Sequence, residues 1–218
     1  MSRGYDLKLT VRETGLADFV RVYQNQAKYL AYCRECDNYD AKWSCPPMDI
    51  DTAEFLSPYS YVTVAAVQMV YHEDVVASTP EDRVKDVTLD TIMPIKAAFH
   101  DAMLDAEREV PGSITLSSGG CTLCPHCTRP DGKPCRQPSR MRYSLDSFGF
   151  DLSAITEDLL GIKLLWCRGK LPAYYTLIHA LLEREPTGGV VERVVRRQLF
   201  ASNERKEDSL KECSQADL

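Results

Sequence analysis

The sequence predicts an α+β or α/β domain in which helices flank a mixed sheet and two cysteine-rich loops carry the binding chemistry. Three observations lead to this prediction. Segments with the composition or alternation of strands interleave with segments of helical periodicity. Glycines and prolines separate many of these segments. The cysteines gather in two loops at the ends of predicted elements, where a rigid scaffold usually presents its binding residues.

The N-terminal half of the chain alternates between strands and helices. Residues 5–11 alternate between polar and apolar side chains and predict a strand, whereas residues 16–32 have apolar side chains at helical spacing. A loop is expected over residues 37–58, which contain three prolines and little periodicity. Residues 60–71 are rich in valine and tyrosine and predict a buried strand.

The middle of the chain contains a helix, a short strand and an irregular loop. The helix is predicted over residues 90–108, with Pro94 near its first turn or at a kink. Residues 112–117 predict a short strand. Four prolines and an Asp-Gly turn pair then keep residues 121–138 irregular.

The C-terminal part predicts short helices, a hairpin and a final helix. Capping residues bound two short helices, one from Ser139 to Gly149 and one from Asp151 or Ser153 to Gly161. Residues 162–167 and 173–182 predict the two strands of a hairpin, although residues 173–184 also suit a helix. An amphipathic helix follows Gly188 and Gly189. We expect one domain over residues 1–201 and a charged, disordered tail over residues 202–218.

The composition excludes several classes of protein and partner. At 44% hydrophobic and 27% charged residues, the chain differs from collagen-like, low-complexity and disordered sequences. Its formal net charge is −6 and it has no long basic run, so we expect neither nucleic acid nor a membrane surface as a partner. The longest apolar stretch, residues 61–71, is about half of the ~20 residues needed to cross a bilayer.

The nine cysteines are the unusual feature of the sequence. The N-terminus lacks the apolar region of a secretory signal, so a cytoplasmic location is expected, where cysteines are thiols or metal ligands. Seven of them form two motifs. The first cysteine motif consists of Cys33, Cys36 and Cys45, and the second cysteine motif consists of Cys121, Cys124, Cys127 and Cys135.

The second cysteine motif favours an iron-sulfur cluster. With two consecutive Cys-x2-Cys spacings, the chain can surround a group larger than a single metal ion, such as a cluster. The Cys-x2-Cys-x2-Cys run of bacterial ferredoxins is an example. The last interval is seven residues rather than three, so that match is partial. Zinc sites more often pair two Cys-x2-Cys hooks a dozen or more residues apart, and zinc, with His126 as a candidate ligand, is the alternative.

The first cysteine motif has only three thiols. Three thiolates suit a four-iron cluster whose fourth iron is open to a small molecule, or is closed by Cys167, a histidine or a nearby aspartate. Cys167 follows an apolar segment and is interpreted first as a small buried hydrophobe. Cys213 lies in the charged tail and is interpreted as an incidental thiol. His72, His100 and His179 occur singly and are interpreted as packed or exposed residues rather than ligands.

Four arginines lie within or just after the second cysteine motif. They could offset the negative charge of a cluster or donate hydrogen bonds to its sulfur atoms, or they could simply be solvated. They are Arg129, Arg136, Arg140 and Arg142.

Three stretches together form a specific pattern. They are Cys33-Arg-Glu-Cys36 with Trp43-Ser-Cys45-Pro-Pro, Cys121-Thr-Leu-Cys124-Pro-His-Cys127 with Gly132-Lys-Pro-Cys135-Arg-Gln-Pro138, and Arg142-Tyr-Ser144-Leu145 with Gly149. In this combination, over roughly residues 25 to 165, the sequence resembles the predicted metal-binding family known as domain of unknown function 2284. The resemblance implies a prokaryotic cytoplasmic protein with bound metal, expected to be iron-sulfur, and implies no reaction. Where such proteins favour Ser-Met-Glu-Ala, this chain has Ser144-Leu145-Asp146-Ser147.

The sequence therefore predicts a cytoplasmic protein with one or two 4Fe-4S clusters. The second cysteine motif would relay electrons. The first would be a second relay or the place where a small molecule is bound and reduced, which would make the protein an iron-sulfur oxidoreductase or a cluster-based lyase. Its expected partner is a redox protein or a small-molecule substrate. The alternative is a zinc-stabilised binding or regulatory module without redox chemistry.

Overall fold

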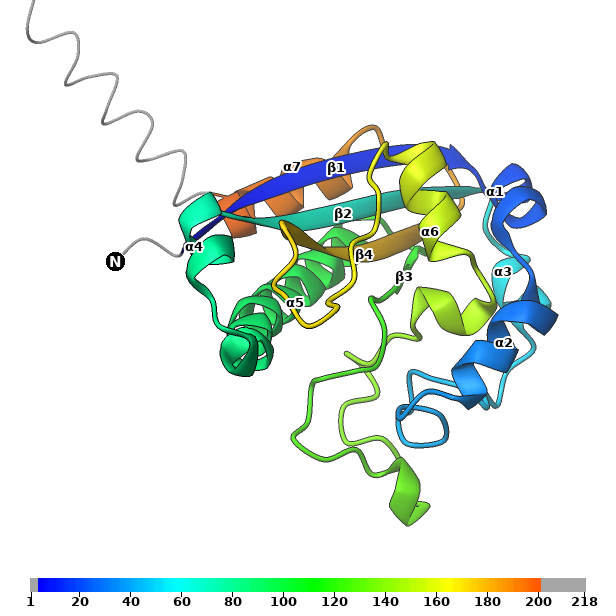
Figure 1. Cartoon of the computed structure of the whole chain (residues 1–218). Helices are drawn as coiled ribbons and strands as arrows, with labels where there is room; N and C mark the ends of the chain where they lie inside the picture. Colours follow the sequence, from blue (N-terminus) through cyan, green and yellow to red (C-terminus); the bar gives the residue numbers. More distant parts are fainter. Residues whose placement is uncertain (1–3, 201–218) are drawn as a thin grey trace, which may run out of the picture.

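A computed structural model describes residues 4–200, and a four-stranded sheet lies at its centre (Figure 1). The strand order is β1-β2-β4-β3, and all three strand pairs are antiparallel. The strands are β1 (Tyr5–Gly15), β2 (Tyr61–Tyr71), β3 (Ile114–Leu116) and β4 (Tyr174–Glu183). With helices on both faces, the molecule has the predicted α+β class.

The sheet is antiparallel rather than mixed, which corrects the sequence-based expectation. The alternation of strands and helices led to the expectation of a mixed sheet. In the structure, the long connection between β1 and β2 starts and finishes at the same end of the sheet. A hydrogen bond from the Leu16 N–H to the Ser60 carbonyl, 2.8 Å long, joins the two ends of this connection. The second strand therefore begins where the first ends and runs back beside it.

The helices are mostly short. The α-helices are α1 (Leu16–Tyr23), α2 (Gln26–Arg34), α3 (Thr52–Leu56), α4 (Glu73–Ser78), α5 (Val84–Glu109), α6 (Leu152–Ala154) and α7 (Val190–Val195). Short 3₁₀ and π turns are η1 (Glu81–Arg83), η2 (Arg129–Asp131), η3 (Leu145–Phe148), η4 (Ile155–Leu159) and η5 (Arg196–Phe200).

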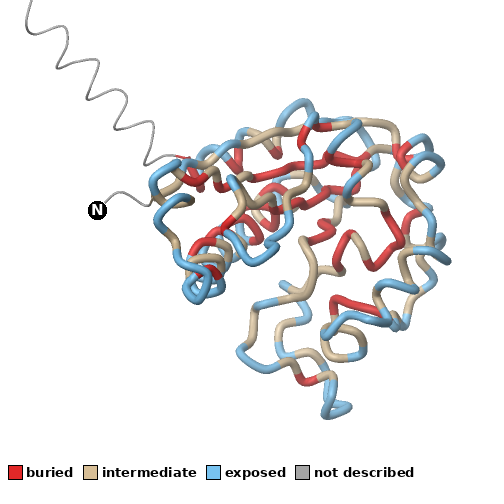
Figure 2. Tube along the Cα trace, in the orientation of Figure 1, coloured by how far each residue is buried: buried red, intermediate tan, exposed pale blue. Residues whose placement is uncertain are grey.

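Both faces of the sheet are buried, which explains why β2 is a nearly continuous apolar run. Alternate residues of β2, including Val64 and Ala66, pack with α1 and with η3. The residues between them, including Ala65 and Val67, pack with α5 and α7. The red core in Figure 2 follows this sandwich, whereas the cysteine-rich loops are mostly half-buried or exposed.

The predicted helix over residues 16–32 is two helices. The segment is helical on both sides of a break at Gln24 and Asn25. Asn25 caps α2, because its side chain accepts a hydrogen bond from the Lys28 N–H at 3.1 Å. Asparagine is among the best N-cap residues, so it ends one helix and starts the next. The next residue back, Gln24, pairs with Phe150 in an isolated β-bridge.

The predicted hairpin over residues 162–167 and 173–182 is wrong in its first strand. Only β4 forms, and β2 occupies one of its edges. On the other edge, β3 pairs with residues 180–182, and the Ser118 hydroxyl bonds both the N–H and the carbonyl of Ile178. These partners leave that part of β4 no free edge for a neighbouring hairpin strand.

Two other differences concern helices. The helix predicted over residues 90–108 begins earlier, at Val84, so that Pro94 lies inside α5 rather than in its first turn. The predicted helix from Ser139 to Gly149 is reduced to η3, although Gly149 ends it with a positive φ of 78°. Among residues 4–200, no helix has the length and apolar character of a membrane span. The predicted tail and Cys213 lie outside the described residues.

Candidate metal centre

The two cysteine motifs lie side by side at the lower edge of the molecule in Figure 1. The first begins with Cys33 in the last turn of α2 and continues into the loop before α3, and the second lies in the long loop after β3. Ser44 joins the two loops, because its Oγ accepts a hydrogen bond from the Cys121 N–H at 2.8 Å. The same oxygen lies 3.5 Å from the Sγ of Cys45.

The four thiols of the second cysteine motif surround one pocket. Cys121, Cys124, Cys127 and Cys135 all line it. Trp43 from the first loop forms part of its wall, and Leu123 and Met141 add apolar surface. Folding therefore brings together residues that span 15 positions of irregular chain, as their spacing predicted.

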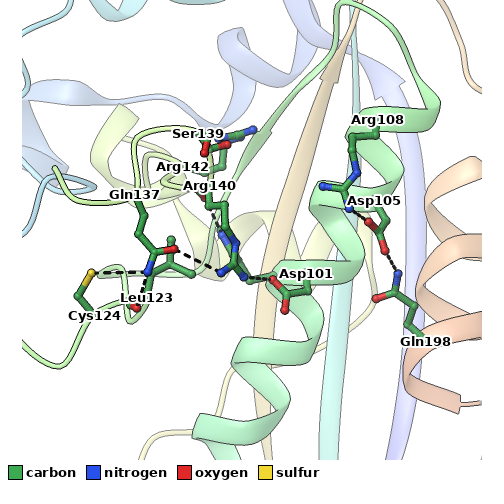
Figure 3. Close-up of polar contacts among 11 residues, drawn as sticks. Asp101, Asp105, Arg108, Leu123, Cys124, Gln137, Ser139, Arg140, Arg142 and Gln198 are labelled. Carbon is green, nitrogen blue, oxygen red and sulfur yellow. Dashed lines mark hydrogen bonds and ion pairs between the residues drawn. The ribbon is translucent and has the colours of Figure 1, made fainter.

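N–H groups point at two of these sulfur atoms. The Gln137 backbone N–H lies 3.4 Å from the Sγ of Cys135, and the Gln137 side-chain amide lies 3.9 Å from the Sγ of Cys124 (Figure 3). The same amide donates to the Leu123 carbonyl at 3.1 Å. Hydrogen bonds to thiolate sulfur are one of the means by which proteins tune iron-sulfur sites.

The thiols of the second cysteine motif are mutually repulsive when they ionise. Burial raises the pKa of Cys121, and the negative charges of Cys135, Cys124 and Cys127 raise it further. Without a cation, the thiol is therefore held in its protonated form at neutral pH. A bound metal would stabilise the thiolates and release their protons, so metal affinity should rise with pH.

The thiols of the first cysteine motif and one carboxylate influence one another through their charges. Burial raises the pKa of Cys33 to about 11, with further contributions from the charges of Asp146, Cys45 and Cys36. Asp146 also raises the pKa of Cys45, after burial. The Oδ1 atom of Asp146 is buried and has no hydrogen-bond partner among the described residues. A buried carboxylate oxygen without a described partner thus acts on the pKa of two of these thiols.

Cys167 does not have the role that the sequence suggested. It lies in residues 162–172, which form no strand, and it is exposed together with Trp166, whose exposed fraction is 68%. The interpretation as a small buried hydrophobe is therefore wrong. Burial raises the pKa of Tyr175 of β4, and its interaction with Cys167 raises that pKa further. Cys167 is not among the groups that shift the pKa of Cys33. His126 is exposed and is not among the residues that line the pocket of the second cysteine motif.

The arginines of the second loop bind oxygen atoms of the protein. Arg142 forms a bidentate ion pair with Glu107, Arg140 pairs with Asp101, and Arg136 donates to the His126 carbonyl. Among the described residues, none of the four arginines donates to a cysteine sulfur. Arg142 and Arg129 are not simply solvated, since their side chains are mostly buried.

Arg129 fastens the two cysteine loops to each other. Its side chain is 8% exposed and lies over the Trp43 ring, 5.2 Å from the centroid. It pairs with Asp40 and donates to the carbonyls of residues 42, 45 and 47. The planar guanidinium group of arginine can donate several hydrogen bonds in fixed directions, which suits it to this position.

Replacing Arg129 with alanine is expected to destabilise the protein by ~3 kcal/mol or more. The substitution leaves three carbonyls of the first loop, two of them in part-buried contacts, without this donor and removes the stacking on Trp43. Denaturant unfolding of the purified protein measures the loss. Arg136→Ala, which removes one exposed contact to the His126 carbonyl, is the matched control and should change the free energy of unfolding by less than about 0.5 kcal/mol. An equal loss of unfolding free energy in the two variants would contradict the conclusion that Arg129 holds the two cysteine loops together.

The three groups that the sequence did not single out are Ser44, Gln137 and Asp146. Gln137 lies within the Cys135-Arg-Gln-Pro138 stretch, and Asp146 lies where the chain departs from the family pattern. The sequence thus drew attention to both positions but indicated no role for either side chain. Ser44 sits between Trp43 and Cys45 without any signal of its role. Among residues 4–200, no three cysteine, histidine or acidic side chains are drawn together around the position of a single ion.

Comparison with known proteins agrees with this picture of a metal centre. A family model described as a predicted metal-binding protein, DUF2284, matches residues 20–181, which include both cysteine motifs. No curated protein and no solved structure matches the chain.

Proposed function

Because this chain belongs to the DUF2284 family of predicted metal-binding proteins, we propose that it is a cytoplasmic iron-sulfur protein that transfers electrons. One observation carries the proposal. Four cysteines at Cys-x2-Cys-x2-Cys spacing line a single pocket, and N–H groups of one residue, Gln137, lie near two of their sulfur atoms. This combination of thiols and N–H donors is typical of iron-sulfur sites.

Cys121, Cys124, Cys127 and Cys135 would hold a 4Fe-4S cluster, which supplies one-electron redox chemistry when bound. The surrounding residues support such a group. Trp43, Leu123 and Met141 limit the access of water to the pocket, and the Gln137 donors stabilise negative charge on sulfur.

Cys33, Cys36 and Cys45 would hold a second cluster with Asp146 as the nearest candidate for the fourth ligand. An unpartnered, buried carboxylate oxygen suits this place, since buried charge is normally paired or bound to a metal. A carboxylate holds iron less strongly than a thiolate does, so a small molecule could displace it. The first cysteine motif is thus either a second relay or the place where a substrate is reduced.

Ser44 connects the two motifs directly. One side of the residue is bonded to Cys121 and the other contacts Cys45, so only one residue separates the two sets of ligands. This short connection favours a function in which both motifs act together. The partner would be a redox protein or a small molecule that gives or takes the electrons.

Protein purified without oxygen should be brown and should contain iron and acid-labile sulfide in similar amounts. Its visible absorption should bleach when a reductant is added, because reduced clusters absorb less. Iron, sulfide and zinc are measured per chain in the same preparation, with iron supplied during growth. A colourless preparation with stoichiometric zinc would contradict the proposal and would indicate a zinc-stabilised module instead.

A further inference from the structure

A second cavity adjoins the second cysteine motif on the side of α5 and β4. It holds about 220 Å³ and reaches Cys121 at one end. Its polar lining comes from Lys96, His100, Asp101, Arg140, Arg142 and His179. Nothing described above assigns a role to this space.

His179 has a nitrogen atom that nothing in the described structure satisfies. The residue is fully buried in β4, and its ring packs on Phe99 with the centroids 4.3 Å apart. Its Nε2 has no hydrogen-bond partner among the described residues. Buried polar atoms are normally paired, so an orphan in the wall of a cavity points to a ligand.

The hydrogen bonds around Ser118 show which ring nitrogen of His179 carries the hydrogen. The Ser118 hydroxyl donates to the Ile178 carbonyl at 2.5 Å and accepts from the Ile178 N–H at 2.8 Å. Because its only hydrogen is used, Ser118 must accept from His179 Nδ1, which lies 2.9 Å away. Burial lowers the pKa of His179 well below 6.5, with further lowering by His100 and Lys96, so the ring is neutral. Its Nε2 therefore presents a lone pair that accepts a hydrogen bond.

Lys96 supplies a positive charge that forms no ion pair with a described carboxylate; burial lowers its pKa, and the charges of Cys121 and Asp146 raise it. Arg140 and Arg142 are each paired with an acidic residue, Asp101 and Glu107 respectively (Figure 3 shows the first pair). Lys96 has no ion pair within 4 Å in the part of the chain described, and its ammonium donates to the Gly120 carbonyl at 2.7 Å. An ammonium has three donors, so two remain for a ligand.

The N–H donor of His100 is already used within the protein and is not free for a ligand. The Nε2 of this histidine lies 2.9 Å from the Arg140 carbonyl, which can only accept, so this nitrogen is the donor and is already used. The cavity thus offers donors at Lys96 and an acceptor at His179.

We propose that this cavity binds a small oxyanion that also carries an O–H group, as in 2-hydroxycarboxylates and hydrogencarbonate. The anionic oxygen atoms would accept hydrogen bonds from Lys96, and the O–H would donate to Nε2 of His179. The size is compatible, since 220 Å³ is below the ~300–1,000 Å³ of pockets for drug-sized ligands and corresponds to about seven waters at ~30 Å³ each. The inference goes beyond the proposed function, because binding requires no particular metal.

Titration calorimetry on the full-length protein, purified without oxygen, tests the proposal with three probes. Sodium glycolate has both the carboxylate and the hydroxyl, sodium acetate lacks the hydroxyl, and sodium hydrogencarbonate is the inorganic source of the same chemistry. Glycolate or hydrogencarbonate should bind about tenfold more tightly than acetate, which is the effect of one hydrogen bond to a buried acceptor. The tighter of the two shows whether the natural ligand is organic or inorganic.

Two substitutions assign the contacts. Lys96→Met should weaken binding of the preferred probe by about tenfold or more, whereas Lys85→Met, on an exposed position of the same helix, should leave it unchanged. His179→Phe should abolish the preference over acetate. Equal affinity for all three probes, no binding at all, or full affinity in Lys96→Met would overturn the proposal. If His179→Phe does not fold, the preference of the unmodified protein still decides the outcome. Metal analysis of the same sample shows separately whether the iron-sulfur proposal holds.

Discussion

Serine in place of Cys124 should remove about half of the bound iron and lower the free energy of unfolding of the metal-loaded protein by ~3 kcal/mol or more. Cys124 is one of four thiols around one pocket, and its sulfur is the one nearest the Gln137 side-chain amide. A serine oxygen is a poor ligand for iron compared with a thiolate. Because metal binds the folded chain, losing it removes that stabilisation. Iron and sulfide analysis and denaturant unfolding measure the two effects.

The same result is expected for serine at each of the other three positions of the second cysteine motif. Cys167→Ser is the matched control, because Cys167 is exposed and lies in neither motif. Cys213→Ser is a second control, chosen from the sequence because that residue lies in the charged tail. A loss of iron in Cys167→Ser as large as in Cys124→Ser would show that the ligands are assigned wrongly.

Mild oxidation should remove iron from the first cysteine motif before the second. The first offers three thiols and the carboxylate of Asp146, whereas the second offers four thiols in one pocket. A carboxylate oxygen binds iron less strongly than a thiolate, so one iron at the first motif is the most labile. Paramagnetic resonance during stepwise oxidation should show a three-iron signal first, while the signal of the second motif persists.

Two substitutions at one position separate this explanation from simple exposure of the first motif. Asp146→Cys would complete a set of four thiols and should slow the loss of iron by about tenfold, whereas Asp146→Asn should hasten it. Asp158→Asn, at an exposed position outside the site, is the control. Identical rates in all three variants and in the unmodified protein would show that Asp146 is no ligand, and the first motif would then be open to solvent or substrate.

The strands and the shared pocket of the four cysteines in the second motif could largely be predicted from the sequence, because both depend on local pattern. Alternation and valine content mark β1 and β2 within a few residues, and the apolar run over residues 173–182 corresponds to β4. Cys-x2-Cys spacing brings thiols together through the turn of the chain itself, whatever the rest of the fold is. The second cysteine motif therefore needed no knowledge of distant contacts.

The direction of the strands and the surroundings of the cysteines were decided only by the tertiary structure. The sheet is antiparallel because the connection from Leu16 to Ser60 doubles back, and no local spacing records that path. The charge of Asp146 acts on Cys33 across more than one hundred positions of the chain, and Arg129 bonds the first loop across more than eighty. Such contacts depend on how the loops pack against one sheet, whereas periodicity and motif spacing describe only neighbours along the chain. The positions of the thiols along the chain were thus determined by the sequence, and the groups that surround them were determined by folding.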